Sequence, residues 1–262
     1  MKVVSYFNVV PSKNKSQEKH DILTKFIEGV NAAGDTGILH QGNDLINADV
    51  GFIQGWQHES GKNATHLRLR QSVIDRTANT HVCTADANLF LYANGRNAPH
   101  HYLRYSFNGV FRNTGNYFDD NVDPARCQEI RKYSNRPIVI RLHPGDRQTQ
   151  SQSPQMKLRI QAQLHNVTLS TQKDLDDDLK NCHAVVNHNS SSIVGPVVKG
   201  FSAFITDPIK SQCAEVAHTD FSLIDTPIEF DRLAWLERIS MFHWKFSELV
   251  DGSAWKHIRQ YV

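Results

Sequence analysis

The chain has 262 residues, with 29 Lys or Arg against 27 Asp or Glu, so its formal net charge is +2. Because 39% of the residues are apolar and the charges are balanced, the composition excludes an intrinsically disordered chain. No apolar run approaches the roughly 18 residues of a membrane span, so we expect neither a membrane span nor a signal peptide. Four scattered cysteines without CxxC spacing indicate reduced thiols of a cytoplasmic protein.

The first half of the chain alternates predicted strands and helices. Apolar runs of strand length occur at 3–10, 37–40, 48–56 and 80–85. Apolar residues at helical spacing predict one helix that ends near Gly34, where glycine can take a left-handed conformation, and another over 64–75. This alternation is typical of a parallel sheet with crossover helices.

The second half restarts the alternation after an aromatic, loop-rich stretch at 88–120 and a helix start at Asp123-Pro124. Strands are predicted at 137–142, 167–170, 184–187 and 202–206, helices at 155–165, 174–181 and 190–199, and the last forty residues as mostly helical. We therefore predict an α/β fold of two Rossmann-like domains, 1–125 and 126–262, facing a cleft, with C-terminal helices crossing back to the first. Ligands are expected at the carboxyl ends of the strands.

The strongest candidate site lies between a predicted strand and a predicted helix, where Asn187-His188 precedes a run of small polar residues. Hydroxyls and unpaired backbone N–H groups at a helix start bind anions, and the helix dipole favours them there. A helix cap alone would need only one of these side chains. The pattern predicts a phosphate site made of Asn189, Ser190, Ser191 and Ser192.

A second candidate follows the strand at 137–142. Arg141 and His143 occupy alternate positions of a strand end, so their side chains point the same way. A guanidinium suits bidentate contact with phosphate, and an imidazole can add a donor. We interpret the two residues as ligand contacts; the alternative is a surface Arg141 paired with Asp146.

Two residues near strand ends of the first half are candidates for a general base. Asp86 follows the strand at 80–85, and His58 follows Gly55-Trp56-Gln57. A transferase that activates an acceptor hydroxyl needs such a base within hydrogen-bond reach. A structural role is the alternative for each residue. His100-His101 lacks a carboxylate at ligand spacing, so we expect no metal site.

Local charge points to an anionic partner of the first half. Residues 61–118 carry seven Lys or Arg against two Asp, a net charge of +5, together with many aromatic residues. Aromatic and Arg side chains in one region are what stacking on extruded bases and phosphate contact require. A solvated basic surface over ordinary core aromatics is the alternative. The candidate acceptor-binding residues are Trp56, Tyr102, Arg104 and Arg112.

With these residues in view, the chain resembles GT-B-fold glycosyltransferases. Over roughly 136–206 it is similar to the nucleotide-sugar half of the capsule and Kdo-type transferase group. The residues that carry this resemblance are Arg141-x-His143-Pro144, Asp174 to Leu179 before Ala184-Val185-Val186, and Asn189-Ser190-Ser191-Ser192 followed by Gly200. The resemblance implies that the serine cluster, Arg141 and His143 hold the phosphates of a nucleotide-sugar donor. The glutamate that many such enzymes use for the donor ribose has no counterpart at 193–196, so UDP and CMP both stay open, with UDP favoured.

More loosely, the short chain and its compact C-terminus resemble phage-encoded transferases that decorate hydroxymethylated cytosines of DNA with glucose or arabinose. This likeness implies an acceptor-binding first domain, a donor-binding second domain and a host-cytoplasmic enzyme that needs no cofactor or metal. Direct displacement would use Asp86, or in second place His58, as the base. Three alternatives stay open: a capsule or lipopolysaccharide-type glycan acceptor, a non-enzymatic nucleotide- or nucleic-acid-binding module, and a nucleotide-sugar epimerase. The oligomeric state is not predicted.

Overall fold

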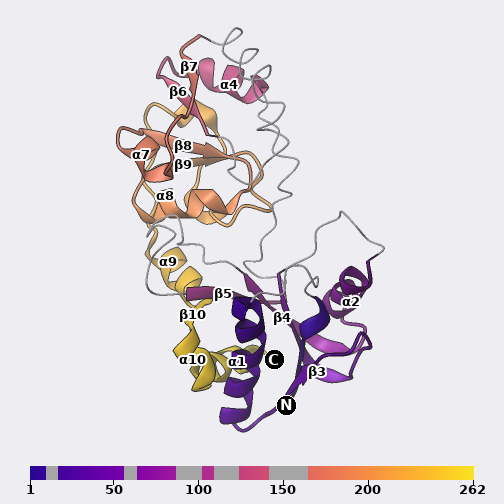
Figure 1. The fold of residues 1–262 in the computed structure, drawn as a ribbon. Helices are drawn as coiled ribbons and strands as arrows, with labels where there is room; N and C mark the ends of the chain where they lie inside the picture. The colour runs from indigo at the N-terminus through magenta and orange to yellow at the C-terminus, as the bar shows by residue number, and fades with distance from the viewer. Residues whose placement is uncertain (10–16, 56–63, 87–101, 109–123, 142–164) are drawn as a thin grey trace. The chain divides into compact units, whose positions relative to one another are not determined.

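A computed structural model describes residues 1–9, 17–55, 64–86, 102–108, 124–141 and 165–262 (Figure 1). They form a mixed α/β protein with mostly parallel strands, which confirms the predicted class. The chain divides into two compact units. The first comprises Met1–Asn88, Asn97–Asn113 and Leu236–Val262, and the second comprises Leu89–Arg96 and Thr114–Trp235. Within the described ranges, no helix has the length and apolar character needed to cross a membrane.

The first unit is built on a six-stranded sheet in the order β10-β5-β4-β3-β1-β2. The four strands from β4 to β2 are parallel, whereas β5 and β10 run antiparallel to their neighbours. The strand bounds are β1 Lys2–Tyr6, β2 Thr36–His40, β3 Ala48–Gln54, β4 Asn79–Asp86, β5 Tyr102–Phe107 and β10 His243–Lys245. The sequence predicted the four parallel strands at nearly these positions. It did not predict β5, which lies in the stretch interpreted as loop-rich, or β10, which lies among the C-terminal helices.

Helices cover both faces of this sheet: α1 (Gln17–Ala32) and α2 (Thr65–Ile74) lie on opposite sides of it (Figure 1). Beneath α1, the ring of Phe26 stacks on Phe52 with centroids 3.9 Å apart, and both rings are buried. The predicted strand 3–10 ends early, at Tyr6, and continues as a 3-10 helix, η1 (Phe7–Val9). The buried Tyr6 hydroxyl accepts the backbone N–H of Ile46 at 3.1 Å, which ties the end of β1 to the segment before β3.

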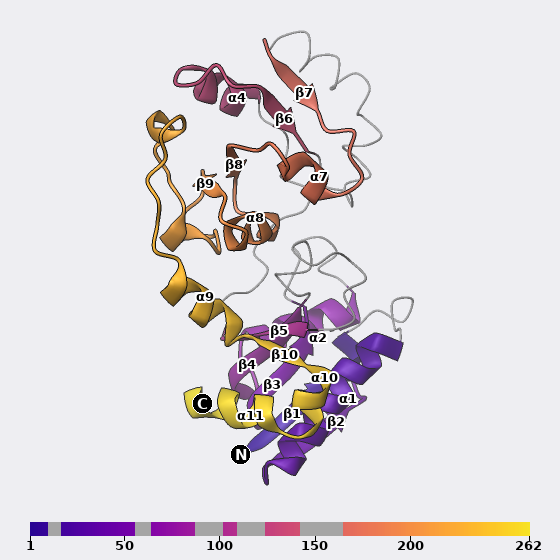
Figure 2. The same cartoon turned by 90° about the vertical axis from the view of Figure 1, so that its left-hand side faces the viewer.

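The C-terminal segment, which the sequence placed in the range of the second domain with helices expected to cross back to the first, packs on the first unit. Its helices α10 (Phe246–Val250) and α11 (Ser253–Ile258), followed by η6 (Arg259–Tyr261), lie beside α1 (Figure 2). A Cβ at Gly29 of α1 would stand 1.7 Å from the carbonyl oxygen of Leu249, so only glycine allows this approach. The buried Trp255 donates its indole N–H to Asp35 at 2.8 Å, which fixes α11 against the end of α1.

The second unit contains two parallel strand pairs, β6 with β7 and β8 with β9. Its strands are β6 Ile138–Ile140, β7 Val167–Leu169, β8 Ala184–Asn187 and β9 Ser202–Ile205. Its helical elements are α4 Pro124–Arg131, α7 Leu175–Leu179, η3 Ser191–Ile193, α8 Val194–Val198, η4 Ala214–Val216 and η5 Phe221–Leu223; α9 Leu233–Ser240 contains the division between the units. All four predicted strands of this half are present, β8 with the predicted bounds and the other three in shorter form. The helix predicted at 155–165 lies outside the described residues.

Candidate functional site

The loop after β8 is ordered by its own polar side chains. Asn187 closes it: its side-chain oxygen accepts the N–H of Ser190 at 2.7 Å, and its side-chain nitrogen donates to Ser192 Oγ at 3.3 Å. Ser190 Oγ lies 3.1 Å from Ser192 Oγ and accepts the N–H of Ser192, which caps η3. The predicted helix at 190–199 therefore starts as η3 and continues as α8. This network holds the serine hydroxyls in fixed places at the carboxyl end of β8.

The same loop has backbone N–H groups that are not bonded to any described residue. Among the described residues, the backbone N–H groups of Asn189 and Ser191 have no acceptor. Ser190, Ser191 and Ser192 are all partly exposed, so solvent or a ligand can reach them. Asn189 differs from them because it is buried and its side chain donates to Asp207 at 2.9 Å. The loop thus offers backbone N–H groups and serine hydroxyls, the donors that bind phosphate at helix starts.

A histidine beside this loop was not assigned a role by the sequence analysis. His188 Nδ1 lies 2.7 Å from the hydroxyl of Thr206, and its Nε2 lies 3.9 Å from a carboxylate oxygen of Asp207. These residues meet because β8 and β9 are parallel and in register, with Asn187 opposite Ile205, so the residues that follow the two strands are adjacent. That rule could have revealed the cluster from the sequence, since polar residues follow both predicted strands.

Asp207 is held in its ionised form. Partial burial raises the pKa of its carboxyl group, but hydrogen bonds from Asn189 and from the N–H of Lys210, with the charge of His188, outweigh this effect, so the pKa lies below its usual value. The carboxyl edge of β8 and β9 therefore combines neutral donors with an ionised carboxylate and the imidazole of His188.

Arg141 lies just after β6, and its guanidinium is occupied by the protein itself. It forms an ion pair with Asp178 of α7 at 2.5 Å and bonds the Ser170 hydroxyl at 3.3 Å. It also donates to three backbone carbonyls, those of Gln172 (3.2 Å), Lys173 (2.7 Å) and Asp174 (3.3 Å). This arginine ties the segment after β7 to α7. The alternative partner, Asp146, and the second predicted ligand, His143, lie outside the described residues.

In the first unit, Asp86 ends β4 at the carboxyl edge of the sheet, as predicted for a residue that follows this strand. Gly55, at the end of β3, has a φ of +72° and donates its N–H to the carbonyl of Ala85. A Cβ at Gly55 would stand 4.0 Å from one carboxylate oxygen of Asp86, and the other carboxylate oxygen of Asp86 is buried. The geometry is compatible with a general base at Asp86.

Five further residues of the first half are predicted to contact the acceptor or to act as the base: Trp56, His58, Tyr102, Arg104 and Arg112. Tyr102 and Arg104 lie on β5, where Arg104 is the β-pairing partner of Asp86, but the described part of the chain does not include their side chains. Trp56, His58 and Arg112 lie outside the described residues altogether. Their roles stay predictions.

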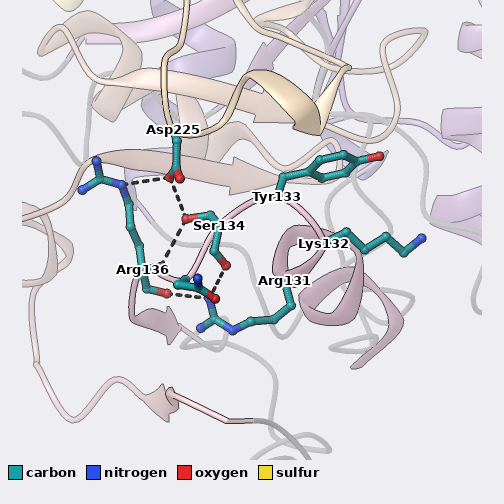
Figure 3. A pocket seen from close by; sticks show the side chains of 7 residues that line it. Arg131, Lys132, Tyr133, Ser134, Arg136 and Asp225 are labelled. Carbon is teal, nitrogen blue, oxygen red and sulfur yellow. Dashed lines mark hydrogen bonds and ion pairs between the residues drawn. The ribbon is translucent and has the colours of Figure 1, made fainter.

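A hollow of about 460 Å³ in the second unit is lined by positive side chains (Figure 3). All three guanidinium nitrogens of Arg131 donate hydrogen bonds to backbone carbonyls, among them those of Ser134 (2.8 Å) and Arg136 (2.7 Å). Asp225 bonds both the Ser134 hydroxyl (2.7 Å) and Arg136 Nε (3.0 Å). Because these charged side chains bond to one another and to the backbone, we interpret the hollow as a place where they hold neighbouring segments together.

Comparisons with protein-family models, with curated proteins and with solved structures found no match to this chain. Within the described ranges, no three His, Cys, Asp or Glu side chains gather as ligands of a metal ion would. The described candidate functional residues lie at the carboxyl ends of β4 and β8.

Proposed function

We propose that the protein is a glycosyltransferase of the GT-B type that moves a sugar from a UDP-sugar to the hydroxyl of a modified cytosine in DNA. The observation that carries the proposal is the ordered loop Asn187–Ser192. At the carboxyl end of a parallel strand it presents serine hydroxyls and backbone N–H groups that have no acceptor among the described residues. Nucleotides bind at such positions in α/β proteins. In a GT-B arrangement the two domains face a cleft, and that arrangement is part of the proposal.

The donor diphosphate would bind at the start of η3. Ser191 N–H and the hydroxyls of Ser190 and Ser192 would supply hydrogen bonds, and the imidazole of His188, held by Thr206, lies in the same loop. Arg141 would act indirectly, without touching the donor, by fixing the segment between β7 and α7. These groups would be in place before the donor arrives, so they would stabilise the negative charge that develops on the departing UDP.

The proposed reaction is a direct displacement. The acceptor oxygen bonds to the anomeric carbon of the sugar while the bond from that carbon to the diphosphate oxygen breaks. Asp86 takes the proton of the acceptor hydroxyl, and UDP leaves with the electron pair of the broken bond. The basic and aromatic composition of 61–118 supports DNA as the acceptor, because an extruded base needs stacking surfaces and phosphate contacts.

Donor binding can be tested by titrating UDP into the protein in a calorimeter and comparing two serine variants. Ser192 and Ser222 are both the second residue of a 3-10 helix, so Ser222→Ala is a matched control for Ser192→Ala. We expect Ser192→Ala to weaken UDP binding about tenfold, the effect of one lost hydrogen bond to a charged group, and Ser222→Ala to leave it unchanged. Equal affinities in the wild type and both variants would contradict the donor site.

The acceptor can be tested by following UDP release from UDP-glucose with three additions: hydroxymethylcytosine-containing duplex DNA, a capsule-type glycan, or none. Release that depends on the DNA would support the proposal. Release with the glycan alone would move the acceptor to a polysaccharide, and conversion of the donor without any acceptor would indicate an epimerase. UDP binding without conversion under all three conditions would indicate a binding module.

A further inference from the structure

Arg70 of α2 reaches the point of the first unit's sheet where the strand order reverses. From β1, the sheet continues to β2 on one side and to β3 and β4 on the other. The Arg70 side chain donates to the carbonyl of Val9, in the 3-10 helix that directly follows β1, at 2.9 Å. Ligands of open α/β sheets bind outside the carboxyl ends of the strands at such a reversal.

The guanidinium of Arg70 has donors without an acceptor in the part of the chain that the structure describes. Its Nε is buried, and among the described residues no acceptor lies within hydrogen-bond distance of it. A buried N–H without an acceptor is costly and rare, so such a group calls for a specific reason. This arrangement contrasts with Arg131, whose three guanidinium nitrogens all have backbone acceptors. Among the described residues Arg70 Nε–H therefore has no acceptor, and a bound ligand could supply one.

The charge around Arg70 selects the kind of ligand. Burial lowers the pKa of its guanidinium, while the charge of Asp86 raises it, and an arginine stays protonated under these conditions. The helix that carries it, α2, contains Arg68 as well and no acidic residue. The missing acceptor is therefore expected to be an anion.

We propose that Arg70 binds a phosphodiester group of the DNA acceptor at the carboxyl edge of β1 and β3. This inference rests on the proposed function and adds a residue and a contact to it. A phosphodiester has two unesterified oxygens, which match the fork of Nε–H and a terminal N–H on one guanidinium. Asp86 lies close enough to Arg70 to influence its charge, so the phosphate contact would fix the DNA strand near the proposed base.

The Nε–H of Arg70 gives its own signal in a proton–nitrogen correlation spectrum, and Arg70→Lys, which lacks this group, identifies the signal. A short hydroxymethylcytosine-containing duplex, added without donor at low salt, should move the signal until the protein is saturated. UDP should leave the signal in place. A signal that the duplex does not move, or that UDP moves and the duplex does not, would overturn the proposal.

Affinity for the same duplex gives an independent test. Arg70→Met should weaken binding about tenfold and reduce the dependence of log K on log salt by about one, as expected for one lost phosphate contact. Arg76→Met removes the same charge from an exposed position at the opposite edge of the sheet, just before β4, and should change the affinity less than about twofold. Equal losses in both variants would contradict a specific contact.

These experiments separate the failure of this proposal from the failure of the proposed function. Sugar transfer to DNA with an unmoved Arg70 signal would overturn the role of Arg70 and leave the transferase intact. A moved signal without transfer from any donor would support the phosphate contact and overturn the transferase. The spectrum is recorded on the wild-type chain, so the test does not depend on whether Arg70→Met folds.

Discussion

Arg141 in the second unit and Arg70 in the first are both partly buried arginines near the carboxyl ends of strands, yet the protein uses them differently. Arg141 meets a carboxylate, a hydroxyl and three carbonyls that lie within nine residues of one another in the sequence. Arg70 has one protein acceptor, the carbonyl of Val9, and a buried Nε without an acceptor among the described residues.

The difference shows that an arginine near a strand end is not by itself a phosphate ligand. What matters is how many of its five donors the protein has already taken. The donors of Arg141 hold the segment from Ser170 to α7 in place, so its loss should affect stability first. Among the described residues only the carbonyl of Val9 accepts a hydrogen bond from Arg70, so its loss should affect binding first.

A substitution of Asp86 tests whether the acceptor binds at the carboxyl edge of β1 and β3, near Arg70. Asp86→Asn removes the proposed base while keeping the shape of the side chain, and should lower kcat about 100-fold or more. Asp75→Asn makes the same change at an exposed position just after α2 and should keep full activity. Both kcat values can be measured as UDP release in the presence of DNA. Equal rates in the wild type and Asp86→Asn would place the base elsewhere, with His58 as the next candidate.

Arg141→Met should destabilise the protein by about 2 to 3 kcal/mol, because it removes five contacts and leaves Asp178, whose side chain is 12% exposed, without its cation. The free energy of unfolding can be measured in urea. Arg136→Met is the matched control: its pair with Asp225 is about half exposed on both sides, so the loss should be at most about 1 kcal/mol. If Arg141→Met kept full stability and lost only UDP binding, Arg141 would be a ligand contact after all.

The lowered pKa of Asp207 predicts that the free energy of unfolding depends on pH, and Asp207→Asn should reduce this dependence. Its pKa is lower in the folded protein than the ordinary value of about 3.9, so the ionised form stabilises the folded state above that pH. This contribution should be lost as the pH falls through the lowered pKa. Urea unfolding between pH 7 and pH 3 should show a smaller loss of stability for the variant than for the wild type. Parallel curves for the two proteins would contradict the assignment.

Cys213 is expected to show the smallest effect. Burial raises the pKa of its thiol to about 12, with a smaller opposing effect from the charge of Arg232. The thiolate is therefore scarce at neutral pH, and thiol reagents should label Cys213 only after unfolding. Mass spectrometry of the labelled native protein reads this out. Rapid labelling of Cys213 would show that its environment opens readily.

The sequence predicted what depends on local pattern. Parallel strands such as β8 and β9 follow from short apolar runs, and Asn187 to Ser192 are neighbours in the chain, so their loop could be recognised before the fold. Contacts between distant segments could not be predicted. The bond from Arg70 to Val9 spans 61 residues, and β10 joins its sheet by pairing with β5, which precedes it by more than a hundred residues. The protein acceptors of Arg141 could not be predicted either, because they lie some thirty residues further on, and its contact with a ligand stays a prediction.

The most direct test of the account is the product of the reaction itself. The protein would be incubated with UDP-sugars and hydroxymethylcytosine-containing duplex DNA, and the DNA digested and its nucleosides weighed by mass spectrometry. If the protein is a DNA glycosyltransferase, the modified cytosine gains the mass of one sugar, and this gain disappears in Asp86→Asn. An unchanged nucleoside mass with every UDP- and CMP-sugar, from protein that still binds UDP, would contradict the claim that this chain is a DNA glycosyltransferase.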